Sequence, residues 1–243
     1  MSGHTVKSYD VEQAELDSRI AQMGGLVESL LWQAFQALDR RDPQLAERAV
    51  RGDSAIDQIE RDVQARAILL MGRRQPVADD LRHAVSVLAI AADLERVGDL
   101  SKSIARRALA ISVAEQPRTI LHGLKHMTQV AARQLKDVLD AWSTRDAGKA
   151  GTVWSADVAL DALYSSVFRD VLSWMMDDPR NIEHGMHLLF IAKNLERIGD
   201  HTTNIAERIR FVVTGKTMSD ERMKSDDTST YTQPARPQTT SAA

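Results

Sequence analysis

The sequence predicts an all-α protein made of two tandem three-helix bundles that are related by an internal repeat. Apolar residues recur at helical spacing along most of the chain, and no segment keeps the alternation of a half-buried strand. Two segments, DLERVGDLSKSIARR from Asp93 and NLERIGDHTTNIAER from Asn194, are identical at eight of fifteen positions. A duplicated segment in a helical chain indicates that one helical unit occurs twice.

Three helices are predicted in the first half of the chain. Their apolar positions run through residues 16–38, 56–70 and 87–104, with the spacing of one helix face. The second of these helices has a clear start, because Asp42 directly precedes Pro43. An aspartate followed by proline is typical of an N-cap and a first-turn residue.

Three more helices are predicted in the second half, with apolar positions through residues 120–142, 153–174 and 182–213. Gly148 and Gly151 are expected to separate the first two, and the Asp178–Pro179 pair to start the third. The helices are expected to be about 25–35 residues long, well above the usual mean, as in an elongated antiparallel bundle. His83 aligns with His184 in the repeat, which favours a repeated packing role for both.

The chain is expected to divide into three parts. Residues 1–115 form the first three-helix bundle and residues 116–216 the second. The Ser/Thr/Pro-rich segment 217–243 has few apolar residues, so it is expected to be a disordered tail.

Composition excludes several classes of function. The chain has no cysteine, which rules out disulfides, thiolate metal sites and a cysteine nucleophile. Its net charge of −3 argues against a nucleic-acid partner. The start of the chain lacks the plan of a signal peptide, and no apolar run approaches the ~20 residues that span a bilayer. A cytoplasmic protein without direct membrane insertion is therefore expected.

Catalytic constellations are also not apparent. There is no Gly-x-x-x-x-Gly-Lys phosphate loop and no nucleophile beside a base, so we do not expect an enzyme. No cluster of arginines stands out in the sequence as a direct phosphate site.

A ridge of small residues runs along the repeated segment. Its members recur every seven residues: Ala91, Gly98 and Ala105 in the first copy, and Ala192, Gly199 and Ala206 in the second. Glycine in a helix interior costs about 1 kcal/mol relative to alanine. Because this destabilising residue occurs at the same position in both copies, it indicates either close packing of two helices or room beside a ligand.

Four pairs of acidic residues follow the pattern acid-x-x-x-Asp, which places both carboxylates of a pair on one helix face. The pairs are Asp53 and Asp57, Glu95 and Asp99, Asp157 and Asp161, and Glu196 and Asp200. Each pair lies beside its helix's apolar stripe, at the edge of the core. The repulsion between facing carboxylates must be reduced by protonation, by arginine or by a cation. Nearby arginines such as Arg96 and Arg197 could provide that relief.

Four pairs at repeat-related positions favour a cation, with one metal site per bundle. Ligation by oxygen alone suits magnesium, manganese or iron better than copper or zinc. His201 follows Asp200 but points about 100° away along the helix, so it is not expected to be a ligand.

With its paired LER(V/I)GD segments and the continuation HTTNIAE, the chain resembles the PhoU family of phosphate-transport regulators. The resemblance covers nearly the whole chain, including all four acidic pairs. It implies a dimeric helical protein without catalysis, in a family where some members bind metal clusters through the acid-x-x-x-Asp motif. It also implies that the same eight carboxylates are the metal ligands.

The resemblance further implies a regulatory function. A PhoU-like protein connects the phosphate ABC transporter to a membrane histidine kinase, and restrains uptake and signalling when phosphate is abundant. Two of the differences between the copies lie close to the acidic pairs in sequence, because Asp93 corresponds to Asn194 and Leu100 to His201. The two metal sites are therefore expected to differ in occupancy or metal preference.

Two other classes of protein stay open. A di-metal carboxylate enzyme of the ferritin-like kind needs two Glu-x-x-His motifs on facing helices. The sequence has none, and Asp80-x-x-His83 is the nearest. A metal-free helical scaffold is the second alternative, which a protein without metal and without a phosphate phenotype would support.

Overall fold

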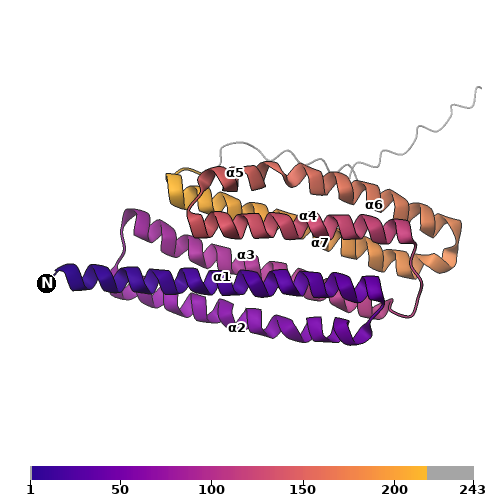
Figure 1. Ribbon diagram of the computed structural model, residues 1–243, viewed down its shortest axis with the longest axis horizontal. Helices are drawn as coiled ribbons and strands as arrows, with labels where there is room; N and C mark the ends of the chain where they lie inside the picture. Colours follow the sequence, from indigo (N-terminus) through magenta and orange to yellow (C-terminus); the bar gives the residue numbers. More distant parts are fainter. Residues whose placement is uncertain (1, 218–243) are drawn as a thin grey trace, which may run out of the picture.

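A computed structural model describes residues 2–217, which form an elongated all-α protein without strands in that range (Figure 1). In chain order the helices are α1 (Ser2–Arg40), α2 (Pro43–Arg74), α3 (Ala78–Ala110), α4 (Arg118–Thr144), α5 (Ala147–Ser155), α6 (Asp157–Asp177), the short 3₁₀ helix η1 (Pro179–Asn181) and α7 (Ile182–Thr214).

The helices form two three-helix bundles, as the sequence predicts. Helices α1, α2 and α3 contact one another in the first bundle, and α4, α7 and the α5–α6 pair do so in the second. The two bundles lie against each other along their length, joined mainly by α3 with α7 and by α1 with α4 (Figure 1). The domain boundary stays a prediction, and all but the first residue of the expected tail lies outside the described residues.

The fifth predicted helix is in fact two helices, and the expected glycine break is wrong. Gly148 and Gly151 lie inside α5, because the break after α4 falls earlier, at Arg145 and Asp146. A second break, at Ala156, divides the fifth predicted helix into α5 and α6. The Gln134 side chain of α4 donates a hydrogen bond to the Ala156 carbonyl at 3.1 Å, which anchors the break. Asp157 therefore becomes the first residue of α6, a position where the helix dipole favours a negative charge.

The connections after α1 and α4 are equivalent in the two bundles. Arg41 and Arg145 both adopt the left-handed conformation, with φ of 52° and 54°. The following aspartates cap the next helix, because Asp42 accepts a hydrogen bond from Leu45 N–H and Asp146 accepts one from Lys149 N–H. The repeat thus extends beyond the segments that the sequence comparison aligned.

The small-residue ridge brings helices close together in both bundles. A Cβ atom on Gly98 would lie 3.1 Å from Ile56 Cδ1 and 3.3 Å from Asp53 Oδ1. A Cβ atom on Gly199 would lie 2.6 Å from Leu160 Cδ2. Both glycines therefore allow close helix packing. Gly98 lies beside Asp53, and Gly199 lies beside Asp157.

Polar contacts join the two bundles at the α3–α7 interface. His201 Nδ1 lies 2.9 Å from Asp93 Oδ1, and Asn194 donates a hydrogen bond to Ser103 at 3.1 Å. Two of the positions at which the repeats differ, Asp93/Asn194 and Leu100/His201, therefore contribute contacts across the bundle interface.

His83 and His184 do not share one environment. His83 is buried, hydrogen-bonded to Asp17 at 2.9 Å and stacked on Trp142, and so links α3 to α1 and α4. His184 is only half-buried.

Candidate metal-binding acidic faces

The first acidic face consists of Asp53 and Asp57 on α2 with Glu95 and Asp99 on α3. Asp53 is buried, and the other three are half-buried. Lys102 Nζ lies 2.5 Å from Asp53 Oδ2 and 3.3 Å from Asp99 Oδ1, and so bridges the two helices. The structure thus brings these four carboxylates to one place and adds an ammonium that the sequence reasoning did not anticipate.

Burial and neighbouring charges raise the pKa of two carboxyl groups on this face, Asp53 and Glu95. Burial raises the pKa of Asp53, and the charges of Asp57 and Asp99 raise it further, while Lys102 opposes the shift. Burial also raises the pKa of Glu95, with the same two aspartates adding to the shift. The Arg96 guanidinium, 3.5 Å from Glu95, partly offsets it. The raised pKa values make Asp53 and Glu95 harder to ionise than isolated carboxyl groups.

The second acidic face consists of Asp157 and Asp161 on α6 with Glu196 and Asp200 on α7. Here three of the four side chains are buried, and only Asp200 is half-buried. Asp157 accepts a hydrogen bond from the Thr203 hydroxyl at 3.3 Å. Lys193 Nζ lies 3.0 Å from Glu196 Oε1 and 5.0 Å from the Tyr164 ring centroid.

The chemistry of both faces fits a hard cation. All eight candidate ligands are carboxylates, which magnesium, manganese and iron accept. On the first face, Asp53 Oδ1 is buried without a hydrogen-bond partner in the protein, which a cation would satisfy. However, no three acidic or histidine side chains within residues 2–217 converge to metal-binding distance. A bound metal would therefore need side-chain rotations, including movement of Lys102 away from Asp53.

Known proteins match this chain over most of its length. The PhoU domain is matched twice, over residues 20–108 and 124–209. A PhoU homolog of Rhizobium meliloti, described as a phosphate-specific transport system accessory protein, is 45% identical over 93% of this chain and 96% of its own. A homolog of the same description in Caulobacter vibrioides is 45% identical over 93% and 98% of the two chains.

Solved structures agree with the sequence relatives. PhoU from Pseudomonas aeruginosa has a TM-score of 0.82 and 35% identity, over 86% of this chain and all of its own. The phosphate transport system regulatory protein PhoU from Streptococcus pneumoniae has a TM-score of 0.79 and 28% identity, over 86% and 99% of the two chains. The chain belongs to the PhoU family, and its relatives are accessory proteins of phosphate transport systems.

Proposed function

We propose that this protein is a cytoplasmic, non-enzymatic regulator that restrains phosphate uptake and phosphate-starvation signalling when phosphate is abundant. Its partners would be the ATPase of a phosphate ABC transporter and a phosphate-sensing membrane histidine kinase, and it would act as a homodimer. The observation that carries the proposal is the match to phosphate-transport accessory proteins over 93% of the chain.

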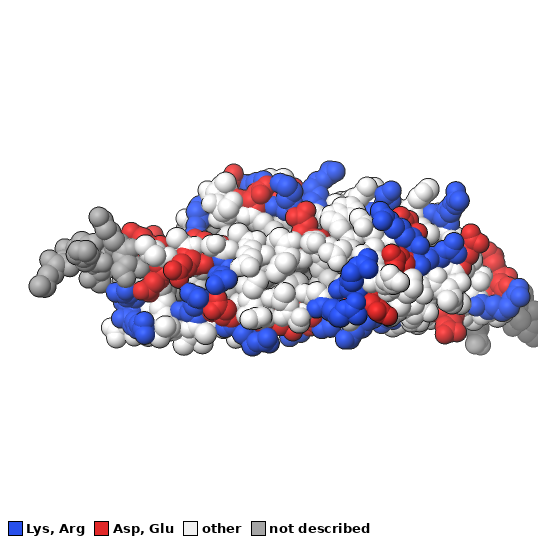
Figure 2. All heavy atoms as spheres, turned by 60° about the horizontal axis from the view of Figure 1, so that its bottom comes forward, with Lys and Arg blue, Asp and Glu red and all other residues white. Residues whose placement is uncertain are grey.

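No helix within the described residues is long and apolar enough to cross a membrane. The face seen in Figure 2 mixes lysine and arginine with aspartate and glutamate around a central area free of these residues. A face of mixed sign lacks the basic stripe that a nucleic-acid binder presents.

The two acidic faces would bind metal as part of this function. Iron, manganese and magnesium are the candidate metals, because all the available ligands are carboxylate oxygens. The second face would bind more tightly, since three of its four carboxylates are buried whereas only Asp53 is buried on the first face.

Deletion of the gene tests the regulatory proposal. In phosphate-rich medium the deletion strain should produce the phosphatase that is normally made only in phosphate starvation, and the intact gene should restore repression. Unchanged phosphatase output in the deletion strain would contradict the regulatory function. A complementing copy with Glu196→Gln tests whether the metal site contributes to it.

A further inference from the structure

A pocket of 290 Å³ lies at one end of the molecule, where the two bundles are connected along the chain. Its walls come from the end of α1, from the α3–α4 connection and from the first turn of α4. The polar residues that line it are Asp39, Arg41, Glu115, Gln116, Arg118 and His122. It is separate from both acidic faces, because it contains none of their residues.

The amide of Gln116 is the best-fixed polar group in this pocket. The residue is only 4% exposed, and its Nε2 donates hydrogen bonds of 2.8 Å to the carbonyls of Ile111 and Ala114. These two bonds fix the orientation of the amide. Its Oε1 is buried without a hydrogen-bond partner in the protein. A buried acceptor of this kind calls for a donor from a ligand.

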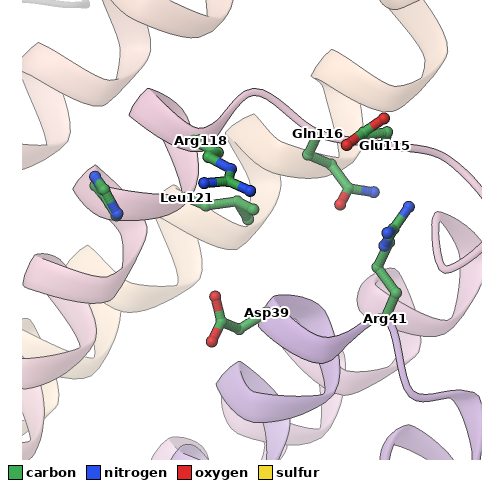
Figure 3. A pocket seen from close by; sticks show the side chains of 7 residues that line it. Asp39, Arg41, Glu115, Gln116, Arg118 and Leu121 are labelled. Carbon is green, nitrogen blue, oxygen red and sulfur yellow. The ribbon is translucent and has the colours of Figure 1, made fainter.

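Two guanidinium groups flank this amide. Figure 3 shows Arg118 and Arg41 on either side of Gln116, with the carboxylate of Asp39 across the pocket. Within residues 2–217 no ion pair joins these three charged side chains. Arg41 also holds the left-handed conformation, which glycine would adopt more easily.

The N-terminus of α4 adds a partial positive charge to a pocket whose two arginines are balanced by Asp39 and Glu115. The N-cap residue of this 27-residue helix is Pro117, whose side chain cannot cap, so the first backbone N–H groups of α4 have no side-chain acceptor. Three residues of the first turns, Arg118, Leu121 and His122, line the pocket. A helix end of this kind favours an anion.

The complementary ligand must accept and donate hydrogen bonds. Arg41 and Arg118 offer only donors, whereas the carboxylates of Asp39 and Glu115 and Gln116 Oε1 offer only acceptors. A phosphate group that keeps one O–H meets both requirements: its oxyanion oxygens accept from the guanidinium groups, and its hydroxyl donates to Gln116 or Asp39. Sulfate has the same shape but no proton at neutral pH. It would leave Gln116 Oε1 unpaired and face the Asp39 carboxylate with lone pairs, which costs affinity.

We propose that this pocket binds a protonated phosphate group and selects it over sulfate. Arg41 and Arg118 donate hydrogen bonds to the oxyanion oxygens, while Gln116 Oε1 or the Asp39 carboxylate accepts a hydrogen bond from the phosphate hydroxyl. The sequence did not reveal the site because Arg41 and Arg118 are far apart along the chain. The inference goes beyond the regulatory function proposed above, and its test uses purified protein without transporter or kinase.

The test is an NMR titration of the full-length protein at pH 7 and constant ionic strength, with inorganic phosphate, glycerol phosphate or sulfate. We expect saturable shifts of the Gln116 side-chain amide and of the backbone N–H signals of residues 118–122 with phosphate. Sulfate should bind at least about tenfold more weakly. Glycerol phosphate is mostly the proton-free dianion at pH 7, so it should bind more weakly than inorganic phosphate. Equal or tighter binding of glycerol phosphate would contradict recognition of the phosphate proton.

Variants separate the site from general attraction of anions. Arg118→Gln and Arg41→Gln should each weaken phosphate binding about tenfold, and glutamine is a residue that this chain already holds in the left-handed conformation, at Gln75. Arg51→Gln removes the same charge from an exposed arginine on α2, and should leave binding unchanged. Asp39→Ala should reduce the preference for phosphate over sulfate. Equal binding of phosphate and sulfate, absence of saturable shifts, or equal loss in Arg51→Gln would overturn the proposal.

Discussion

On the first acidic face the Lys102 ammonium lies 2.5 Å from buried Asp53, whereas the repeat-equivalent position on the second face holds Thr203, whose hydroxyl lies 3.3 Å from Asp157. The carboxylates occupy equivalent positions, but they are stabilised differently. Asp53 sits in the middle of α2, far from either helix end, while Asp157 begins α6 and gains from the helix dipole.

We propose that this difference makes the second face the preferred metal site. An ammonium held between Asp53 and Asp99 competes directly with a cation, because both use the same oxygens. The second face has a lysine as well, but Lys193 contacts Glu196 from the same helix and its side chain is 40% exposed, against 23% for Lys102. The more exposed side chain moves away at lower cost. The two copies of one motif thus differ in how a lysine contacts their carboxylates, because Lys102 bridges two helices of the first face and Lys193 contacts Glu196 on the second.

The largest expected effect concerns the helix contact beneath each face. Gly199→Leu should destabilise the protein by about 3 kcal/mol and Gly98→Leu by about 1–3 kcal/mol, because overpacking forces neighbouring side chains and backbone to move. The order follows from the room at each site, since an added Cβ would meet Leu160 at 2.6 Å but Ile56 at 3.1 Å. Chemical denaturation measures both variants. Wild-type stability in both would show that the ridge does not pack closely.

Exchange of the two repeat-equivalent residues tests the comparison itself. Lys102→Thr should destabilise the metal-free protein by about 1–3 kcal/mol, because it leaves the buried Asp53 charge without its cation. It should also increase metal binding by the first face, and added manganese should recover stability. Thr203→Lys should decrease metal binding by the second face. Thermal melts with and without manganese measure both variants. An equal change in melting temperature on adding manganese to the two variants would contradict the proposed difference between the faces.

The bundle interface offers a variant that should leave the acidic faces unaffected. His201→Leu installs the residue found at the equivalent position in the first repeat, and removes the contact with Asp93. We expect a loss of about 0.5–1.5 kcal/mol, the usual net value of one hydrogen bond. Metal content should not change. A loss of metal in this variant would show that the differing positions act on the sites and not on the interface.

The smallest expected effect is on the pH dependence of the first face. The pKa values of Asp53 and Glu95 are raised on folding, so between the ordinary and the raised value the folded state binds more protons than the unfolded state. Their contribution to stability is therefore greatest at acidic pH and declines as pH rises through the raised pKa values. Glu95→Gln should stabilise the metal-free protein at pH 7 by about 0.2–0.5 kcal/mol, because it removes like-charge repulsion from Asp99.

Matched denaturation curves at pH 5 and pH 7 measure this effect. The stabilising effect of Glu95→Gln should be smaller at pH 5, where the wild-type carboxyl group is already partly protonated. An equal effect at both pH values would show that charge at Glu95 does not matter.

The sequence predicted the fold well because the helices follow from periodic patterns. Apolar spacing indicated the helices, and Asp42 capped α2 as expected. The break at Ala156 was missed because it depends on Gln134, a side chain from another helix. The prediction of a break at Gly148 and Gly151 was wrong, because a helix that starts from the Asp146 cap tolerates both glycines.

The candidate sites were predicted less completely, because their balance of charge depends on tertiary contacts. The i,i+4 pattern placed the four acids of the first face together, as found. The i,i+4 pattern did not predict that Lys102 contacts Asp53 on the neighbouring helix. The alignment of Lys102 with Thr203 was the available signal, because a charge difference beside a repeated acid predicts a difference between the sites.

Metal content by elemental analysis tests the central claim most directly. The wild-type protein, an Asp53→Asn/Glu95→Gln variant and an Asp157→Asn/Glu196→Gln variant would be incubated with iron(II) or manganese(II), desalted and analysed, with melting curves to confirm folding. We predict that wild type retains metal, that the first-face variant keeps most of it and that the second-face variant loses most of it. Equal loss in both folded variants, or no metal in wild type, would contradict the account.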